Sequence, residues 1–325
     1  MPILYKFIDD LIVLREMTFL ASDPAGFNDP FEVRPCYDQE AHDHFAASRE
    51  AFDRLVGGDG DALTGSGSMV GLPVENVFGL ADDLNKRFRG DLSARFRALC
   101  LSSSAQSVLM WAHYGRLKGG APYSGVAIGI DTDHPDFPAG LRAGGFSISY
   151  DPDRTRNTLP LAYYLTPGPE MYGVGADGRW GLINPPGQLV RSGSLYITFA
   201  DYQQQLEAAF LKALTTKAAC WSYEEEVRFV YDLRTETRLW READKPDRIR
   251  IPPGALKQVI LGPQATATTA EEITDLFHAG TLGTPALFFS DCHPFEYAVR
   301  KNDAPPDYIL AWYRTILPIH APRVP

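Results

Sequence analysis

The sequence has little positive charge. It contains 31 lysine and arginine residues against 41 aspartates and glutamates, which leaves a formal net charge of -10. A surface built to bind nucleic acid has to neutralise phosphates, so this balance argues against DNA or RNA as a partner. It favours a small-molecule or protein substrate. Hydrophobic residues make up 45% of the chain, which is ample for a globular core.

Cysteine is also scarce. The chain has 4 cysteines, none of them in a CxxC pair: Cys36, Cys100, Cys220 and Cys292. Zinc knuckles and dithiol redox sites need closely spaced cysteines. The sequence therefore predicts reduced thiols that serve in packing, because free cysteine is among the most buried residue types.

The chain lacks an apolar run long enough to span a bilayer. Its opening segment, MPILYKFIDDLIVLREMTFL, has Asp9, Asp10, Arg15 and Glu16 within the apolar stretch. A signal peptide instead has a charged start, an uninterrupted apolar stretch and small residues, in that order. We therefore expect a cytoplasmic protein without membrane contact.

Several catalytic motifs are missing. The sequence has no GxxxxGK[ST], no GxGxxG after an expected strand, no HExxH and no GxSxG. His42 and His44 lie near Glu40 and Asp43, but residues two apart on a helix face different sides. This group predicts a solvated helix face, and we expect no metal site.

Strands and helices are expected in mixed order, without a regular βαβ rhythm, which predicts an α+β fold. Expected strands are ILYKF, ALCLSSS, YSGVAIGID, GFSISYD, LKQVILGP and PALFFSDC. Expected helices cover residues 39–56, 74–97 and 200–218 and the segments AQSVLMWAHYG and TATTAEEITDLFHAG, the last with threonines available as N-cap. We predict one domain over residues 1–325, with a core over about 3–290, a Gly-rich loop at 57–68, a long loop at 152–193 and a proline-rich tail without regular structure.

The segment CWSYEEEVRFVYDL, residues 220–233, combines strand-like apolar residues with consecutive glutamates. In an extended chain Trp221, Tyr223, Val227, Phe229 and Tyr231 would share one face with Glu225. The other face would hold Ser222, Glu224, Glu226, Arg228 and Asp232.

This charged row has two interpretations. It is either a polar sheet edge that Arg228 neutralises, or part of a site in which Glu224 and Glu226 project side by side, about 7 Å apart. Such a pair suits a reaction that develops positive charge, such as glycosidic cleavage through an oxocarbenium-like state. His113 and Tyr114 interrupt an apolar helix in MWAHYG, and His113 is either a core histidine bonded to a backbone carbonyl or a functional residue.

Four segments together resemble a bacterial family known as domain of unknown function 2971: ILYKF, FNDPFEV, CLSSSAQSVLMWAHYG…SGVAIGID and CWSYEEEVRFV. They cover most of residues 3 to 262. The family's opening Leu-Tyr-Lys strand, its Trp-x-His-Tyr signature and its Tyr-Glu-x-Glu-x-Arg signature match Leu4–Lys6, Trp111–Tyr114 and Tyr223–Arg228. The resemblance implies a fold but no settled activity.

The order of these segments is also similar to that of the ADP-ribosyltransferase superfamily. Those enzymes surround NAD with a polar residue on a first strand, a Ser or Tyr element and a late strand with Glu. The similarity implies a split mixed or antiparallel sheet flanked by helices. In this chain Lys6 stands where the superfamily usually has Arg or His.

The resemblance implies roles for individual residues. Tyr5 or Lys6 and Ser102 or Ser103 would position NAD, and Tyr114 would stack on the nicotinamide ring. Glu226 would stabilise the ribosyl cation, while Glu224 would orient an acceptor or water. Asn28 and Asp29 would close the pocket or merely cap a turn. The candidate catalytic residues are thus Glu224, Glu226, His113 and Tyr114, and the candidate cofactor-binding residues are Tyr5, Lys6, Asn28, Ser102, Ser103 and Arg228.

Three functions remain open from the sequence. The first is NAD-dependent ADP-ribosyl transfer or NAD hydrolysis in a defence or toxin context. The second is a metal-dependent nuclease that uses Glu224, Glu226 and His113. The third is a non-enzymatic interaction module in which the same residues form a buried polar network.

Overall fold

The structure is a computed structural model that describes residues 3–29, 32–33, 77–135, 145–151, 171–174, 180–183, 189–192, 195–235, 247–292, 299–303 and 305–315. The expected helix over 39–56 with His42 and His44, the loop at 57–68 and the tail segment LPIHAPRVP lie outside these residues. The chain groups into two compact units, each built from segments that are far apart in sequence. The single-domain organisation stays a prediction.

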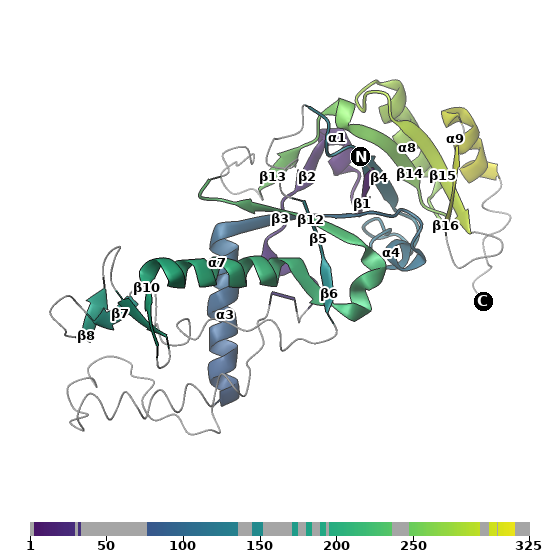
Figure 1. Ribbon diagram of the computed structural model, residues 1–325. Coiled ribbons are helices and arrows are strands. Elements are labelled where there is room, and N and C mark those ends of the chain that lie inside the picture. The colour runs from purple at the N-terminus through teal and green to yellow at the C-terminus, as the bar shows by residue number, and fades with distance from the viewer. Residues whose placement is uncertain are drawn as a thin grey trace. The chain divides into compact units, whose positions relative to one another are not determined.

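The first unit is built on an eight-stranded mixed sheet with the strand order β16-β15-β14-β4-β1-β3-β12-β5 (Figure 1). Its strands are β1 (Leu4–Ile8), β3 (Phe96–Ser102), β4 (Val126–Ile130), β5 (Gly145–Ser147), β12 (Glu226–Asp232), β14 (Leu256–Leu261), β15 (Ala286–Cys292) and β16 (Val299–Asp303). Strands β14 and β15 are parallel and are connected through helix α8 (Ala267–His278), whereas the other neighbours pair antiparallel. The predicted α+β class is confirmed.

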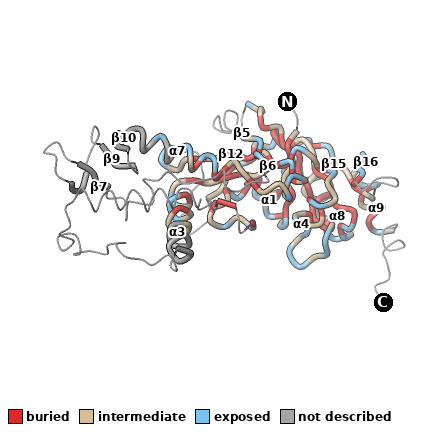
Figure 2. The backbone as a smooth tube through the Cα atoms, turned by 60° about the horizontal axis from the view of Figure 1, so that its bottom comes forward, coloured by how far each residue is buried: buried red, intermediate tan, exposed pale blue. Residues whose placement is uncertain are grey.

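Both faces of this sheet are covered by helices. On one face, which we call the α8 face, α1 (Ile12–Glu16), α8 and α9 (Pro306–Thr315) pack through Leu14, Ile273 and Ile309 on strand residues such as Ile128 and Phe289. On the other, the α4 face, α4 (Val108–His113) packs Trp111 and Met110 against Phe7, Ala127 and Ile260. Side chains alternate between faces along each strand, and Figure 2 shows the buried residues concentrated in the strands of this sheet.

Capping explains where several helices begin. The Thr266 side chain accepts a hydrogen bond from the Thr269 amide at the start of α8, as the sequence predicts. Ser107 does the same for the Met110 amide at the start of α4. Helix α9 was not predicted, because the two prolines before Asp307 resemble a turn, yet proline is well tolerated at the first position of a helix.

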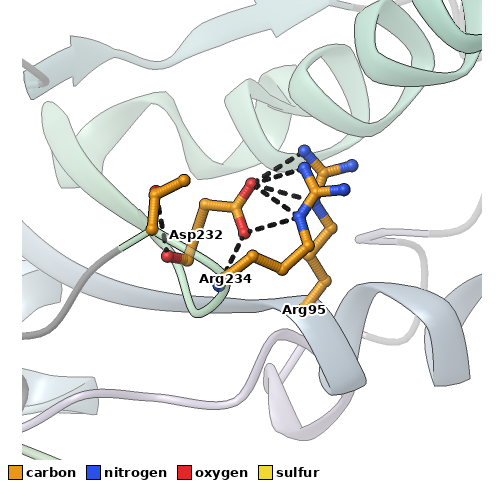
Figure 3. Close-up of polar contacts among 4 residues, drawn as sticks. Arg95, Asp232 and Arg234 are labelled. Carbon is orange, nitrogen blue, oxygen red and sulfur yellow. Dashed lines mark hydrogen bonds and ion pairs between the residues drawn. The ribbon is translucent and has the colours of Figure 1, made fainter.

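An ion-pair cluster fixes the end of β12 (Figure 3). The Asp232 carboxylate accepts hydrogen bonds from Arg95 at 2.8 and 3.0 Å and from Arg234 at 2.8 and 3.1 Å. Partial burial raises the pKa of Asp232, but the hydrogen bonds from Arg234 and Arg95 outweigh it and bring this pKa far below its usual range.

The second unit comprises residues 27–94 and 151–218. It contains most of α3 (Val77–Arg95), helix α7 (Phe199–Thr215) and an antiparallel sheet with the order β10-β9-β7-β8. These strands are β7 (Met171–Val174), β8 (Trp180–Ile183), β9 (Leu189–Ser192) and β10 (Leu195–Thr198). The prediction of a long loop over 152–193 is therefore wrong in part, because the short strands β7, β8 and β9 lie among its Gly and Pro residues.

The remaining strands are short. Strand β2 (Thr18–Leu20) pairs with β13 (Arg248–Arg250), and the other two are β6 (Ser149–Asp151) and β11 (Thr216–Ala218).

None of the described helices combines the length and the apolar character that a membrane span requires.

Candidate functional site

Three neighbouring strands bring the candidate residues to one end of the sheet. Tyr5 on β1 lies opposite Ser102 on β3, and Ser102 lies opposite Glu226 on β12. Since these strands are antiparallel neighbours, the start of β1, the end of β3 and the start of β12 meet there. Tyr5, Ser102 and Glu226 consequently share the α4 face.

Lys6 lies on the other face. It alternates with Tyr5 and therefore points to the α8 face, together with Leu4 and Ile8. Strands β1 and β3 are in register at a single pair and then separate. The Lys6 ammonium donates a hydrogen bond to the Cys100 carbonyl oxygen at 3.1 Å, in a place where β1 no longer supplies a backbone partner. Of the two predicted first-strand residues, only Tyr5 thus shares a face with Glu226.

The glutamates do not form the expected row. Residues Ala219–Glu224 form a 3-10 helix, η5, and β12 begins at Glu226. Between them Glu225 has a φ of 43°, in the left-handed region that L-residues other than glycine rarely adopt. The prediction that Glu224 and Glu226 project side by side from one extended strand is therefore wrong.

Glu226 and Arg228 form a buried ion pair. The guanidinium donates from Nε to Oε1 at 2.8 Å and from Nη2 to Oε2 at 2.9 Å, and the two residues are 5% and 1% exposed. Strand β12 lies between β3 and β5. The interpretation of a polar sheet edge is wrong for this pair, and Arg228 is enclosed by protein where the sequence suggested cofactor contact.

Glu224 is buried as well, with 4% exposure. Its Oε1 accepts a hydrogen bond from the Tyr114 hydroxyl at 2.6 Å. Tyr114 follows α4, so this bond ties the α4 segment to η5, 110 residues later in the sequence.

Glu225 is the exposed member of the three glutamates. Ser103 holds it twice: the Ser103 hydroxyl donates to Oε2 at 2.6 Å, and the Ser103 amide donates to the Glu225 carbonyl oxygen at 3.0 Å. Among the described residues, Ser103 is the one hydrogen-bond partner of the Glu225 carboxylate, and no cation pairs with it. This places an accessible carboxylate, in a strained backbone position, beside the end of β3 and the start of β12.

Aromatic rings lie close to these carboxylates. His113 is exposed and stacks on Tyr223, with ring centroids 5.9 Å apart and an interplanar angle of 29°. Trp221 packs against the same Tyr223, at 5.9 Å and 40°. The interpretation of His113 as a core histidine is therefore wrong, and the part-exposed rings offer a surface for a planar ligand.

Two further candidates lie differently from the prediction. Ser102 is 2% exposed, and its hydroxyl closes a turn by donating to the Ser104 carbonyl oxygen and accepting from the Ser104 amide. Asn28 is exposed and belongs to the second unit, whereas the other candidates belong to the first.

Cys100 lies on β3, two residues before Ser102, and is a free cysteine. Burial raises the pKa of its thiol to about 12, so it is a packing residue.

Within the described part of the chain, no three histidine, cysteine, aspartate or glutamate side chains gather in a way that could hold a metal ion.

Comparison with known proteins adds no family. No family model, no curated protein and no solved structure matches this chain. The resemblances to the family of unknown function and to the ADP-ribosyltransferases stay predictions from the motifs.

Sequence reasoning missed Glu225, the accessible carboxylate. In a regular strand the Glu225 side chain would lie on the apolar face, where a charged residue has no evident role. A signal was present in this mismatch, because a glutamate among five aromatic or branched residues is a poor fit to a core face. The change in backbone direction at Glu225 resolves the mismatch.

Proposed function

We propose that this protein cleaves NAD at the bond between nicotinamide and ribose and passes the ADP-ribosyl group to an acceptor or to water. In this reaction the glycosidic bond breaks and its electron pair leaves with nicotinamide. The acceptor oxygen or nitrogen then bonds to the ribose carbon and loses a proton. The observation that carries the proposal is the accessible Glu225 carboxylate, held by Ser103 where β3 ends and β12 begins.

The arrangement agrees with the order that the superfamily resemblance implies. A first strand, a serine-rich strand end and a late glutamate strand are neighbours in the sheet as β1, β3 and β12. The mixed sheet separates between β1 and β3 after one register pair, which suits the split sheet expected of that superfamily. The finer assignment to an ADP-ribosyltransferase-like fold is part of this proposal.

The residues take the following roles in the proposal. Glu225 stabilises the positive charge that develops on the ribosyl group, as a fixed carboxylate does for an oxocarbenium-like state. Glu224 and Glu226, which are buried and bonded to Tyr114 and Arg228, position the segment that carries Glu225. The stacked rings of His113 and Tyr223 bind the nicotinamide ring.

The test is incubation of the purified protein with NAD in the presence of a chelator, followed by chromatography for free nicotinamide. Release that is insensitive to the chelator supports the proposal. Glu225→Gln should lose this release, and Glu271→Gln is its matched control. Glu271 pairs with Arg314 on the far side of the sheet, between α8 and α9. The absence of nicotinamide release by the native protein would reject the proposal.

A non-enzymatic interaction module is the second candidate. It is favoured by the burial of Glu224, Glu226 and Arg228: Glu224 connects η5 to Tyr114 after α4, and Glu226 and Arg228 pair with each other within β12. Such networks specify a unique core without any chemistry. NAD turnover distinguishes the two candidates. Replacement of Glu225 would reduce turnover in the enzyme, whereas the interaction module would have no turnover and its stability would not change measurably.

A further inference from the structure

A second polar cluster lies on the same α4 face, toward the other edge of the sheet. The Gln258 Oε1 atom on β14 accepts a hydrogen bond from the Tyr5 hydroxyl at 3.2 Å and another from the Lys301 ammonium at 2.9 Å. Tyr5 and Gln258 both lie opposite Gly129 of the intervening strand β4. The cluster thus joins β1, β14 and β16 across the sheet.

Gly129 makes this connection possible. A Cβ atom at this position would lie 3.0 Å from the Gln258 Cβ atom and 3.2 Å from Cε1 of Tyr5. Without a side chain on β4, the Tyr5 ring can extend across that strand toward Gln258. This close approach is a reason for glycine in the middle of a strand.

Lys301 is a part-buried cation without a carboxylate partner. Its ammonium lies 4.3 Å from the centroid of the Phe288 ring and bonds the neutral amide oxygen of Gln258. Asp303, two residues further along β16 and exposed, acts on it through its charge, but no ion pair forms between described carboxylates and Lys301. Partial burial lowers the pKa of Lys301, and the charge of Asp303 opposes that shift.

The cluster presents donors and almost no acceptors. Gln258 uses its oxygen for Tyr5 and Lys301, and its Nε2 group has no hydrogen bond to any described residue. Lys301 has N–H groups beyond the one that it donates to Gln258. A partly desolvated cation beside unused N–H groups is a setting that an anion with several oxygens satisfies.

We propose that Lys301 and Gln258, supported by Tyr5, bind a phosphate-type oxyanion on the α4 face of the sheet. If NAD is the substrate, its diphosphate is the natural occupant, and this last assignment rests on the proposed function. Anion binding itself does not depend on it. Arg300, the next residue along β16, lies on the opposite face and pairs with Asp291, so it takes no part in the cluster.

The test is calorimetric titration of the full chain with inorganic pyrophosphate at fixed ionic strength. We expect binding by the native protein and a loss of affinity of about tenfold or more in Lys301→Met, which removes the ammonium and its charge-assisted bond but keeps an unbranched side chain. Arg300→Met removes the same charge from the same strand and should leave the affinity within about twofold of native. Gln258→Glu gives Lys301 a carboxylate partner and should abolish binding even if Lys301→Met folds poorly.

Pyrophosphate that does not bind the native protein would overturn this inference, as would equal losses in Lys301→Met and Arg300→Met. The result is separable from NAD cleavage. Pyrophosphate binding without nicotinamide release would contradict the proposed reaction alone, and nicotinamide release without pyrophosphate binding would contradict this site alone.

Discussion

The Arg228 guanidinium donates two hydrogen bonds to the Glu226 carboxylate two residues earlier on β12, and both side chains are enclosed by protein. The pair shares the α4 face with Ser102 and Cys100, which lie directly opposite on β3. The Glu226 and Arg228 charges therefore neutralise each other in a part of the sheet that water does not solvate. Removing one partner leaves a buried charge, whereas removing both does not.

The first prediction concerns this pair. Glu226→Gln should lower the free energy of unfolding by about 3–5 kcal/mol, because it removes the carboxylate charge that pairs with the buried Arg228 guanidinium. The double variant Glu226→Gln with Arg228→Met should recover part of that loss. Urea unfolding of the single and double variants measures both effects. A single variant as stable as the native protein would show that the pair is not buried in solution.

The second prediction concerns Tyr114. Tyr114→Phe removes the hydrogen bond to the buried Glu224 carboxylate and should lower the free energy of unfolding by roughly 1–3 kcal/mol. Tyr308→Phe is the control, since Tyr308 is 52% exposed. Thermal unfolding compares the two variants. Equal melting temperatures for both would contradict the bond between Tyr114 and Glu224.

The third prediction concerns Gly129. Gly129→Ala introduces a Cβ atom 2.8 Å from Cγ2 of Ile3 and 3.0 Å from Cβ of Gln258, so a loss of about 1–3 kcal/mol is expected from overpacking. Gly90→Ala in α3 meets no atom within 4 Å and should stabilise the protein, by about 0.5–1 kcal/mol. Chemical denaturation distinguishes the signs. Destabilisation by both substitutions to the same extent would argue against close packing at Gly129.

The fourth prediction is a pH dependence at Asp232. Its pKa in the folded protein lies below the ordinary value of 3.8, so the folded state binds a proton less readily than the unfolded chain does. The stabilisation by Arg95 and Arg234 is complete above pH 3.8 and declines as the pH falls below it. Asp232→Asn should therefore cost about 1–2 kcal/mol at neutral pH, with allowance for solvent exposure, and progressively less in acid. A difference between native and variant that stays constant from neutral pH to below pH 3 would contradict this linkage.

Much of the sheet was predictable from local patterns. The strands around Tyr5, Leu99, Ile128 and Val259 are short apolar runs with branched residues, and the structure places a strand at each. The threonine cap of α8 was also predictable, because a side-chain oxygen before the first turn of a helix accepts a hydrogen bond from a free helix amide. Local chemistry determines these elements.

The site was less predictable, because it depends on a local departure from regular structure. A pattern of alternating faces assumes an extended chain through Glu225, whereas η5 and the left-handed φ of Glu225 redirect each glutamate separately. The cluster of Tyr5, Gln258 and Lys301 joins residues up to 296 positions apart through strand order, which no short sequence window contains. Strand order is decided by tertiary packing.

The most direct measurement is the rate of nicotinamide release from NAD by Glu225→Gln, compared with native protein and Glu271→Gln, with the melting temperature of each. We predict a loss of at least about a hundredfold in rate for Glu225→Gln, because a fixed charge at the reacting centre is removed. Its melting temperature should stay that of the native protein, since Glu225 is exposed and makes one side-chain hydrogen bond. Native rates in Glu225→Gln, or no release by the native protein, would contradict NAD cleavage at Glu225.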